Sequence, residues 1–348
     1  MLSRHSRRTA AAACLAVSLV AAACGGGDKK DPVASGSPSA STSKKPTPSP
    51  SKSEGPLRSP FTGRAVDQLN RVLAIKIDNA RAARPQAGLD KADIVYEELV
   101  EGGTTRFLAI FSSQEAPVLG PVRSVRETDM PLLRQFGTVL FAFSGGSPGV
   151  ARIARNAPLI DASVDAAPGA YYRNNSRPAP YNLFTASGRL FAAKTAGVKA
   201  QDVGFRFGAG NYATSTKASQ VSLTWSKAAK TYFTYDPKTL LWSRGDERGP
   251  AMLTSGARMS TPNIVLMHCL VVGGNYRDTA GNLSPFTHTQ GKGTVEVFRD
   301  GTRTVGTWSR PAPFAGTSLR DRNGKTITLR PGPVWVLLAP QTSSVGVG

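Results

Sequence analysis

The spacing of apolar residues divides the chain into two halves with different predicted structure. In residues 61–215, apolar runs of strand length alternate with segments of helical character, which predicts an α/β (or α+β) domain. The predicted strands are residues 71–78, 93–100, 105–112 and 138–144, the last apolar almost throughout, as in a strand covered on both faces. The predicted helices are residues 148–156, residues 187–196 and a segment after Ser124, in which Pro131 introduces a kink or delays the start to about Asp129.

Residues 216–345 carry short β-like runs separated by turn residues such as Asp300-Gly301 and Asn323-Gly324. The predicted strands are residues 221–225, 231–235, 240–243, 263–272, 294–298, 302–308, 325–329 and 334–338. This pattern predicts a β-rich C-terminal domain, built as a small barrel or a sandwich.

The first 23 residues have the pattern of a secretory signal peptide. A basic start is followed by an apolar stretch, 10–23, that is shorter than the approximately 20 residues needed to cross a bilayer. The stretch ends at Cys24, and Val20 to Gly25 resembles a bacterial lipobox, with Ala21 where Leu is preferred. We therefore expect lipidation of Cys24 and anchoring at the outer face of the cell membrane; the alternative is a plain cleaved signal with an incidental cysteine.

Residues 24–60 would then begin with the lipidated cysteine and continue as a flexible linker. Positions 25–60 hold nine Ser, seven Pro and five Gly and no aromatic residue, so they can bury little apolar surface. The linker would hold the folded part away from the membrane.

The chain is strongly basic, with a formal net charge of +20, most of it in residues 61–348. This charge favours acidic partners: anionic lipid head groups, cell-wall polymers or nucleic acid. Nucleic acid is not expected, because no helix-turn-helix, aromatic nucleic-acid motif or dense Lys/Arg run is present. With three Cys and three His, the sequence predicts no disulfide scaffold, metal site or cofactor. A basic but merely solvated surface is the alternative interpretation.

Residues 145–149 match the G-x-S-x-G pattern of a hydrolase nucleophile elbow, between a predicted strand and a predicted helix. Pro148 argues against a serine hydrolase, because the residue after the nucleophile must donate its backbone N–H to the oxyanion. The better interpretation is a tight turn at Gly145 and Gly146, with Ser147 capping a helix that starts at Pro148. The start of such a helix attracts anions.

Two arginines, Arg123 and Arg126, lie near another predicted helix start and could share one crevice with this turn. We predict that Arg123, Arg126, Gly145, Gly146 and Ser147 hold an anionic group. Arg173 and Asn182 are expected to close the site. The alternative is that both central arginines only pair with acidic residues and fix the fold; the candidates are Asp78, Glu97, Glu98 and Glu101.

Carboxylate catalysis is a rival hypothesis, with Asp78, Glu98 or Asp129 as acid or base. Glu97 and Glu98 are neighbours on a strand and face opposite sides, so only one of them can line a given cleft. Cys269 is expected to be a buried thiol beside His268 rather than part of a Cys–His pair.

Several longer motifs resemble the YerB-like lipoproteins, a two-part bacterial family of unknown function. They include residues 92–107 (ADIVYEELVEGGTTRF), the GPVRSVR segment from Gly120, SGGSP from Ser144 and the ending LRPGPVWV from Leu329. Where the family tends to have Pro-His-Asn, this chain has Pro180-Tyr181-Asn182. The resemblance implies a two-part lipoprotein and no established reaction.

The sequence therefore favours a membrane-anchored binding lipoprotein over an enzyme. The expected ligand is an anionic part of the cell envelope: a cell-wall glycan, peptide or teichoic polymer. An envelope hydrolase or transferase, and an adaptor for a protein partner at the membrane, are the alternatives.

Overall fold

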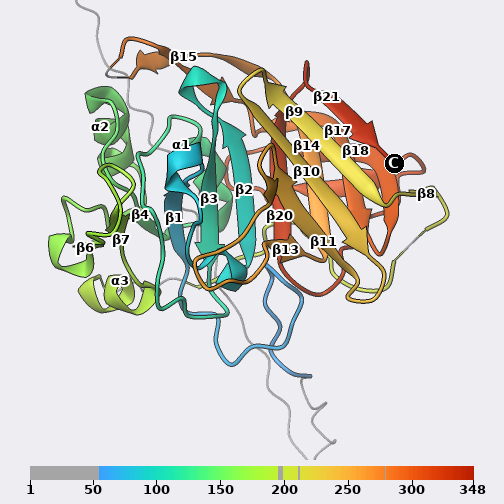
Figure 1. The fold of residues 1–348 in the computed structure, drawn as a ribbon. Helices are drawn as coiled ribbons and strands as arrows, with labels where there is room; N and C mark the ends of the chain where they lie inside the picture. The colour runs from blue at the N-terminus through green and yellow to red at the C-terminus, as the bar shows by residue number, and fades with distance from the viewer. Residues whose placement is uncertain (1–54, 195–198, 211, 279) are drawn as a thin grey trace, which may run out of the picture. The chain divides into compact units, whose positions relative to one another are not determined.

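The structure, a computed structural model, describes residues 55–194, 199–210, 212–278 and 280–348, which belong to a single unit (Figure 1). The predicted signal peptide, Cys24 and positions 25–54 of the predicted linker lie outside the described residues. Ser59 is buried, so the folded unit includes the end of the predicted linker.

A sheet of eleven strands dominates the described part of the chain. In spatial order its main path is β19 (Ser318–Asp321), β18 (Thr302–Arg310), β17 (Gly291–Arg299), β14 (Asn263–Cys269), β20 (Val334–Pro340), β2 (Ile94–Leu99), β3 (Thr105–Phe111), β1 (Leu73–Asp78), β4 (Leu140–Ala142) and β5 (Ile160–Asp161). The short β8 (Ser215–Lys217) pairs with β18.

A second sheet has six strands, all from the C-terminal half of the chain. They are β12 (Gly249–Pro250), β11 (Leu241–Asp246), β10 (Ala229–Asp236), β9 (Gln220–Ser226) and β21 (Ser344–Val347), with β13 (Ser260–Thr261) beside β11. Two small hairpins complete the strands: β6 (Tyr172–Arg173) with β7 (Leu183–Phe184), and β15 (Val271–Arg277) with β16 (Leu283–Thr287).

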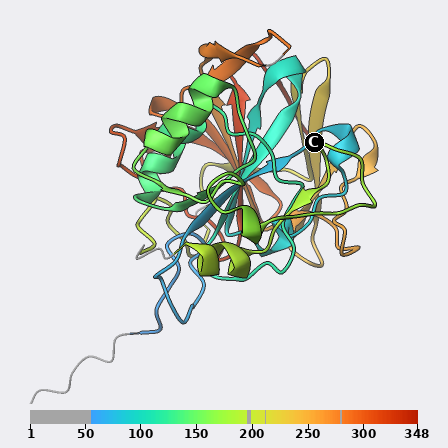
Figure 2. The same cartoon turned by 90° about the vertical axis from the view of Figure 1, so that its left-hand side faces the viewer.

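The helices are short and lie in the N-terminal half. They are α1 (Asp129–Leu133), α2 (Pro148–Asn156) and α3 (Ser187–Ala193), with 3-10 turns η1 (Arg81–Ala83), η2 (Leu89–Lys91), η3 (Glu101–Gly103), η4 (Arg134–Phe136) and η5 (Pro168–Ala170). α2 and α3 lie at the end of the large sheet that β4 and β5 form, as both views show (Figures 1 and 2). Among the described residues, no helix is long and apolar enough to cross a bilayer.

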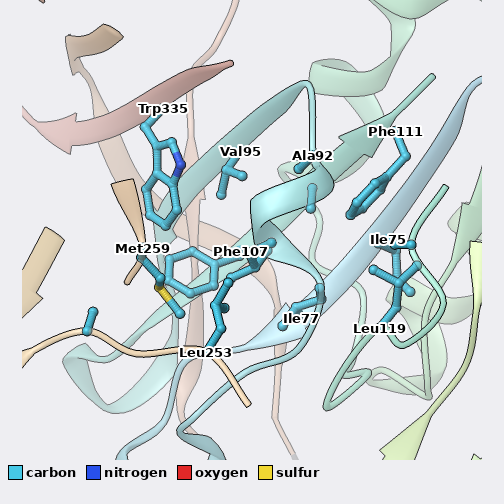
Figure 3. Close-up of a cluster of buried hydrophobic side chains, with 14 of the residues drawn as sticks. Ile75, Ile77, Ala92, Val95, Phe107, Phe111, Leu119, Leu253, Met259 and Trp335 are labelled. Atoms are coloured by element: carbon cyan, nitrogen blue, oxygen red, sulfur yellow. The ribbon is translucent and has the colours of Figure 1, made fainter. Parts of the chain in front are cut away.

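The two faces of the large sheet carry separate apolar cores. On one face, Phe107 and Trp335 pack edge to face with ring centroids 5.4 Å apart (Figure 3). Phe233 of the six-stranded sheet belongs to the same cluster. On the other face, Leu108 belongs to a cluster that packs under α1 and α2. The alternation along β3 explains the split, because successive strand residues point to opposite faces.

The N-terminal part is mixed α/β and the C-terminal part is rich in strands, as the sequence predicted. The expectation of a self-contained C-terminal barrel or sandwich is corrected in one respect: several C-terminal strands share a sheet with the N-terminal strands. β20 pairs in parallel with β2 and with β14, so one sheet continues from the first half into the second. The six-stranded sheet stacks on this shared sheet.

Individual elements agree with the sequence where a capping or breaking residue fixed them. α2 has the predicted bounds, and α1 starts at Asp129, the later of the two starts that Pro131 allowed. The apolar run 263–272, predicted as one strand, is divided at Leu270 between β14 and β15. Residues 325–329, also predicted as a strand, form only isolated bridges.

Candidate functional site

The candidate residues gather at one edge of the large sheet. β1 runs parallel to β4, and β3 lies antiparallel between β1 and β2, so β1, β2 and β4 all end at this edge. In α/β sheets, ligands bind at the carboxyl ends of parallel strands. Asp78 ends β1, Glu98 lies near the end of β2, and the loop 144–147 follows β4.

Backbone hydrogen bonds join the arginine segment to the glycine loop. Arg123 N–H donates to Lys76 O at the end of β1 (2.9 Å), and Ser144 N–H donates to Arg123 O (3.0 Å). Val125 N–H donates to Gly145 O (3.1 Å). The segment 123–125 is therefore fixed between β1 and the loop after β4.

A cavity of about 480 Å³ opens between these segments, and we call it the arginine cavity. Its lining includes the predicted group Arg123, Arg126, Gly145, Gly146 and Ser147, together with Arg106, Glu101, Ser124, Ser144, Asp278, Asn282 and Ser284. The sequence prediction that the two arginines and the glycine turn share a crevice agrees with this geometry.

The Arg126 guanidinium is held by hydrogen bonds to other groups of the protein. Its Nε and Nη2 both donate to Glu101 Oε2, at 2.8 and 2.5 Å, and its Nη1 donates to the carbonyl of Val125 at 2.9 Å. The same guanidinium holds the pKa of Glu101 below its ordinary value, against the opposing effect of burial. Arg126 thus fixes the wall of the cavity, and Glu101 balances its charge.

The Arg123 guanidinium has a carboxylate neighbour at only one of its nitrogens among the described residues. Its Nε lies 2.8 Å from Asp78 Oδ2, and the ring centroid of Tyr181 is 6.0 Å from its Cζ. No hydrogen bond from Nη1 or Nη2 to another described residue is found. Each arginine therefore pairs with a carboxylate, as the alternative interpretation expected, and each also lines the cavity.

Arg106 was not predicted, yet it is the most exceptional group in the cavity. It lies on β3 opposite Asp78 of β1 and Glu98 of β2. Its Nε and Nη1 are buried and have no hydrogen-bond partner among the described residues. Burial lowers the pKa of Arg106 to about 10, with further lowering from the charges of Arg126 and Arg123. Buried donors are nearly always paired, so two such nitrogens without an acceptor among the described residues are unusual.

The start of α2 faces the same cavity. Gly145 adopts φ +71°, which favours glycine, and a Cβ on Gly146 would lie 2.9 Å from Cγ1 of Val125. Ser147 occupies the N-cap position and Pro148 follows it, as predicted. The Ser147 hydroxyl does not cap the helix, however; its Oγ is buried and unpartnered among the described residues. The first N–H groups of α2 and this hydroxyl remain available to a ligand.

The β15–β16 hairpin brings C-terminal residues over the cavity. Glu127 accepts hydrogen bonds from Asn275 N–H (2.9 Å) and Asn275 Nδ2 (2.5 Å), and Ser284 Oγ donates to Glu101. Asp278 at the hairpin end binds Asn282, whose amide donates to it at 3.1 Å. The cavity is completed by residues far apart in the sequence.

The carboxylates proposed as acid or base lie behind the cavity wall. Lys76 donates to Glu98 and, at 2.9 Å, to Asp129, and all three side chains are fully buried. Burial raises the pKa of Glu98 to about 7; Lys76 opposes this shift and Asp129 adds to it. Neither Glu98 nor Asp129 lines the cavity, and Asp78 reaches it only through Arg123.

Other candidates lie elsewhere. Arg173 donates to Asn182 at 2.7 Å on the β6–β7 hairpin, and neither residue lines the arginine cavity. Cys269 is fully buried, which raises the pKa of its thiol to about 12, while His268 faces the other way and pairs with Glu296 at 2.9 Å. Within the described ranges, no cluster of three or more His, Cys, Asp or Glu side chains is placed to hold a metal ion.

Two family models match the chain. "Protein of unknown function (DUF3048) N-terminal domain" matches residues 61–201, and "Protein of unknown function (DUF3048) C-terminal domain" matches residues 221–336. The chain belongs to the DUF3048 family.

The chain is similar to "Putative lipoprotein YerB" of Bacillus subtilis (strain 168), with 27% identity over 303 residues, 84% of this chain and 88% of that protein. The crystal structure of YerB protein from Bacillus subtilis has a TM-score of 0.70 at 24% identity and covers 83% of this chain and 99% of that one. The resemblance drawn from the sequence motifs is confirmed, and the solved structure has the same fold.

In this DUF3048 protein the arginine cavity draws on both matched domains. Arg106, Arg123 and the glycine loop belong to the N-terminal match, and Asp278 and Ser284 belong to the C-terminal match. The residues of the C-terminal match carried no motif that connected them to the site.

Proposed function

We propose that this DUF3048 protein is an extracytoplasmic lipoprotein that binds an anionic group of a cell-envelope ligand in the arginine cavity. Similarity to a protein named as a lipoprotein supports the first part. The basic start, the apolar stretch and Cys24 support anchoring at the outer face of the cell membrane.

One observation carries the binding proposal: the two buried, unpartnered nitrogens of Arg106. A guanidinium presents its donors in a fixed fork that matches a carboxylate or a phosphate. Arg123 and the start of α2 approach the same space, and both favour negative charge. A bound anion would supply the acceptors that Arg106 lacks.

The lining also limits the kind of ligand. Glu101 neutralises Arg126, and Asp78 partly neutralises Arg123, so the cavity suits one compact anionic group better than several adjacent charges. The hydroxyls of Ser124, Ser144 and Ser147 add neutral hydrogen-bonding groups. We therefore propose a carboxylate or a single phosphate carried by a sugar or peptide, as found in cell-wall glycans, peptides and teichoic polymers.

Binding can be tested on the purified chain from Cys24 to Gly348 with muropeptides, teichoic acid fragments and inorganic phosphate. A ligand at one hundred times its Kd stabilises the protein by about 2.7 kcal/mol, which a thermal-shift assay detects. We expect a shift that is lost in Arg106→Met and reduced in Arg123→Met. Arg152→Met is the matched control, because Arg152 is an exposed arginine of α2 outside the cavity lining.

The same assay separates the alternatives. A binding protein keeps its ligand in Glu98→Gln, because Glu98 does not line the cavity. Turnover of a bound muropeptide that Glu98→Gln abolishes would favour the hydrolase or transferase. If no compound shifts the folded protein, the anion-binding proposal is wrong, and a search for a protein partner at the membrane follows.

A further inference from the structure

A second cavity of about 590 Å³ lies between α1, the turn η4 and the C-terminal end of α2. Its walls are mainly apolar and include Met130, Ile153, Leu159 and Phe314. It shares no lining residue with the arginine cavity. Cavities of this size with apolar walls and a few polar groups are typical of small-molecule sites.

Arg134 is the charged residue in this lining. Its Nε is buried and has no hydrogen-bond partner in the part of the chain that the structure describes. Its Cζ lies 4.4 Å from the ring centroid of Phe314, a cation–π contact that orients the guanidinium. A buried donor without an acceptor, held in place beside apolar walls, points to an anionic atom of a ligand.

The aromatic wall leads to the same conclusion. Phe314 is 61% exposed, the most exposed large apolar side chain among the described residues. An exposed aromatic ring at the edge of an apolar cavity leaves surface that a ligand can cover. Met130 and Leu159 continue that surface into the cavity, where both pack against the buried core.

We propose that this cavity binds an amphipathic anion, with an apolar chain along Met130, Ile153 and Leu159 and the anionic end at Arg134. The apolar walls would exclude the hydrophilic polymers proposed for the arginine cavity, so this is a separate site. The chemistry can come from a free fatty acid or from a lipid with an anionic phosphate head. Such molecules are concentrated at the membrane at which the chain is proposed to be anchored.

The test is isothermal titration of the chain from Cys24 to Gly348 with decanoate, which stands for a fatty acid, and decyl phosphate, which stands for a phosphate lipid. Hexanoate and decyltrimethylammonium are the matched comparison probes. We expect decanoate or decyl phosphate to bind more than tenfold more tightly than hexanoate, because each buried methylene group adds to affinity. The cationic probe should not bind. Whichever of the two anions binds more tightly identifies the source of the ligand.

The variants locate the binding. Arg134→Met should weaken binding of the preferred anion about tenfold, because a charged hydrogen bond is lost. Phe314→Ala changes an exposed side chain that the fold does not need and should also weaken it. Arg152→Met, an exposed position on α2, and Arg106→Met, in the other cavity, should leave the affinity unchanged.

Three results would overturn the proposal: no binding of either ten-carbon anion, equal binding of the cationic probe, or unchanged affinity in both Arg134→Met and Phe314→Ala. None of them bears on the arginine cavity, whose proposal depends on its own ligands and on Arg106. Circular dichroism of each variant shows that it is folded before it is titrated.

Discussion

At the residue scale, Arg106 combines a cost to stability with a use in binding. Its Nε and Nη1 are buried away from water and have no acceptor among the described residues. This loss of hydrogen bonds lowers the stability of the unliganded protein. Arg106→Met keeps an unbranched side chain that reaches about as far as Nε of the arginine, and it removes the charge. We expect an unfolding free energy that is unchanged or about 1 kcal/mol higher, together with loss of anion binding, measured by urea unfolding and titration. A large loss of stability would instead give Arg106 a structural role.

Glu98 predicts a dependence of stability on pH. Burial raises its pKa in the folded protein to about 7, above the ordinary 4.5, so between these values the folded state binds more protons than the unfolded state. The ionisation of Glu98 therefore lowers the unfolding free energy of the protein as pH rises from about 5 to 8. Glu98→Gln can still accept from Lys76 and should gain stability relative to the wild type over this range.

Urea unfolding of both proteins at pH 5, 6, 7 and 8 measures this difference. Carboxylates whose pKa values are lowered, such as Glu101 and Glu296, act in the opposite direction, but they are present in both proteins and cancel. A difference that stays constant with pH would show that Glu98 is charged throughout this range.

The sequence could predict residues whose neighbours along the chain reveal their setting. A turn and a helix start are predicted by Gly145, Gly146 and Pro148. Arg123 lies close to another predicted helix start. Arg106 has no such context: it stands in a strand beside apolar residues, and its importance depends on what packs over it. The sequence signal that could have pointed to Arg106 is its position as the single Arg in the apolar run 105–112. The sequence also could not predict that Arg173 pairs with Asn182 outside the cavity, because this contact depends on the register of a hairpin.

At the element scale, the β15–β16 hairpin is held over the site by a few polar contacts. Glu127 accepts two hydrogen bonds from Asn275, and Thr128 Oγ1 accepts one from Thr287 N–H at 3.0 Å. Glu127→Ala removes the two hydrogen bonds from Asn275 and leaves the arginines of the cavity in place. We expect faster hydrogen exchange in residues 271–287 and a several-fold loss of anion affinity.

Exchange in β1 and β3 is the internal control for this variant and should not change. Protection of the hairpin equal to that of the wild type would show that packing alone, including Tyr276 against Gly149, holds it.

Elements with local stop signals were predictable and those defined by long-range pairing were not. Pro148 fixes the start of α2, whereas Leu270 separates β14 from β15 although the sequence runs on without a break in apolar character. The division exists because β14 pairs with β17 and β20, while β15 leaves the sheet to pair with β16. Apolar pattern alone does not specify which partner a strand takes.

At the scale of the whole molecule, the proposed anchor makes a direct prediction. Cys24→Ser removes the thiol that would carry the lipid and leaves the folded unit unchanged. We expect the protein to move from the membrane fraction to the soluble extracytoplasmic fraction and to lose labelling with radioactive palmitate. Retention of label would place the lipid elsewhere, and unlabelled wild-type protein would favour the plain cleaved signal.

The shared sheet predicts that the two matched domains fold together. β2 lies between β3 and β20, and all five of its register partners in β20 come from the far end of the chain. Without the C-terminal half, β2 becomes an exposed edge made of buried residues such as Ile94 and Tyr96. The opposite core also loses Trp335, which packs on Phe107.

A buried ion pair adds to this dependence. Arg244 of the six-stranded sheet donates to Glu97 of β2 at 2.9 Å, between the rings of Phe107 and Trp335. Removing one partner would leave the other charge buried and unpaired, which costs about 3–5 kcal/mol. A fragment of residues 55–215 would therefore keep Glu97 in the core without Arg244.

We expect the fragment 55–215 to lack cooperative unfolding and dispersed amide resonances, whereas the chain 55–348 should unfold in one transition by calorimetry and by tryptophan fluorescence. Adding the fragment 216–348 in trans is the stringent control, because it restores β20 and Arg244 without a covalent link. Independent folding of the first fragment would mean that β2 tolerates an open edge, and the cavity could then be studied without its hairpin. Recovery of structure only on mixing would establish that the C-terminal half is required for the site to form.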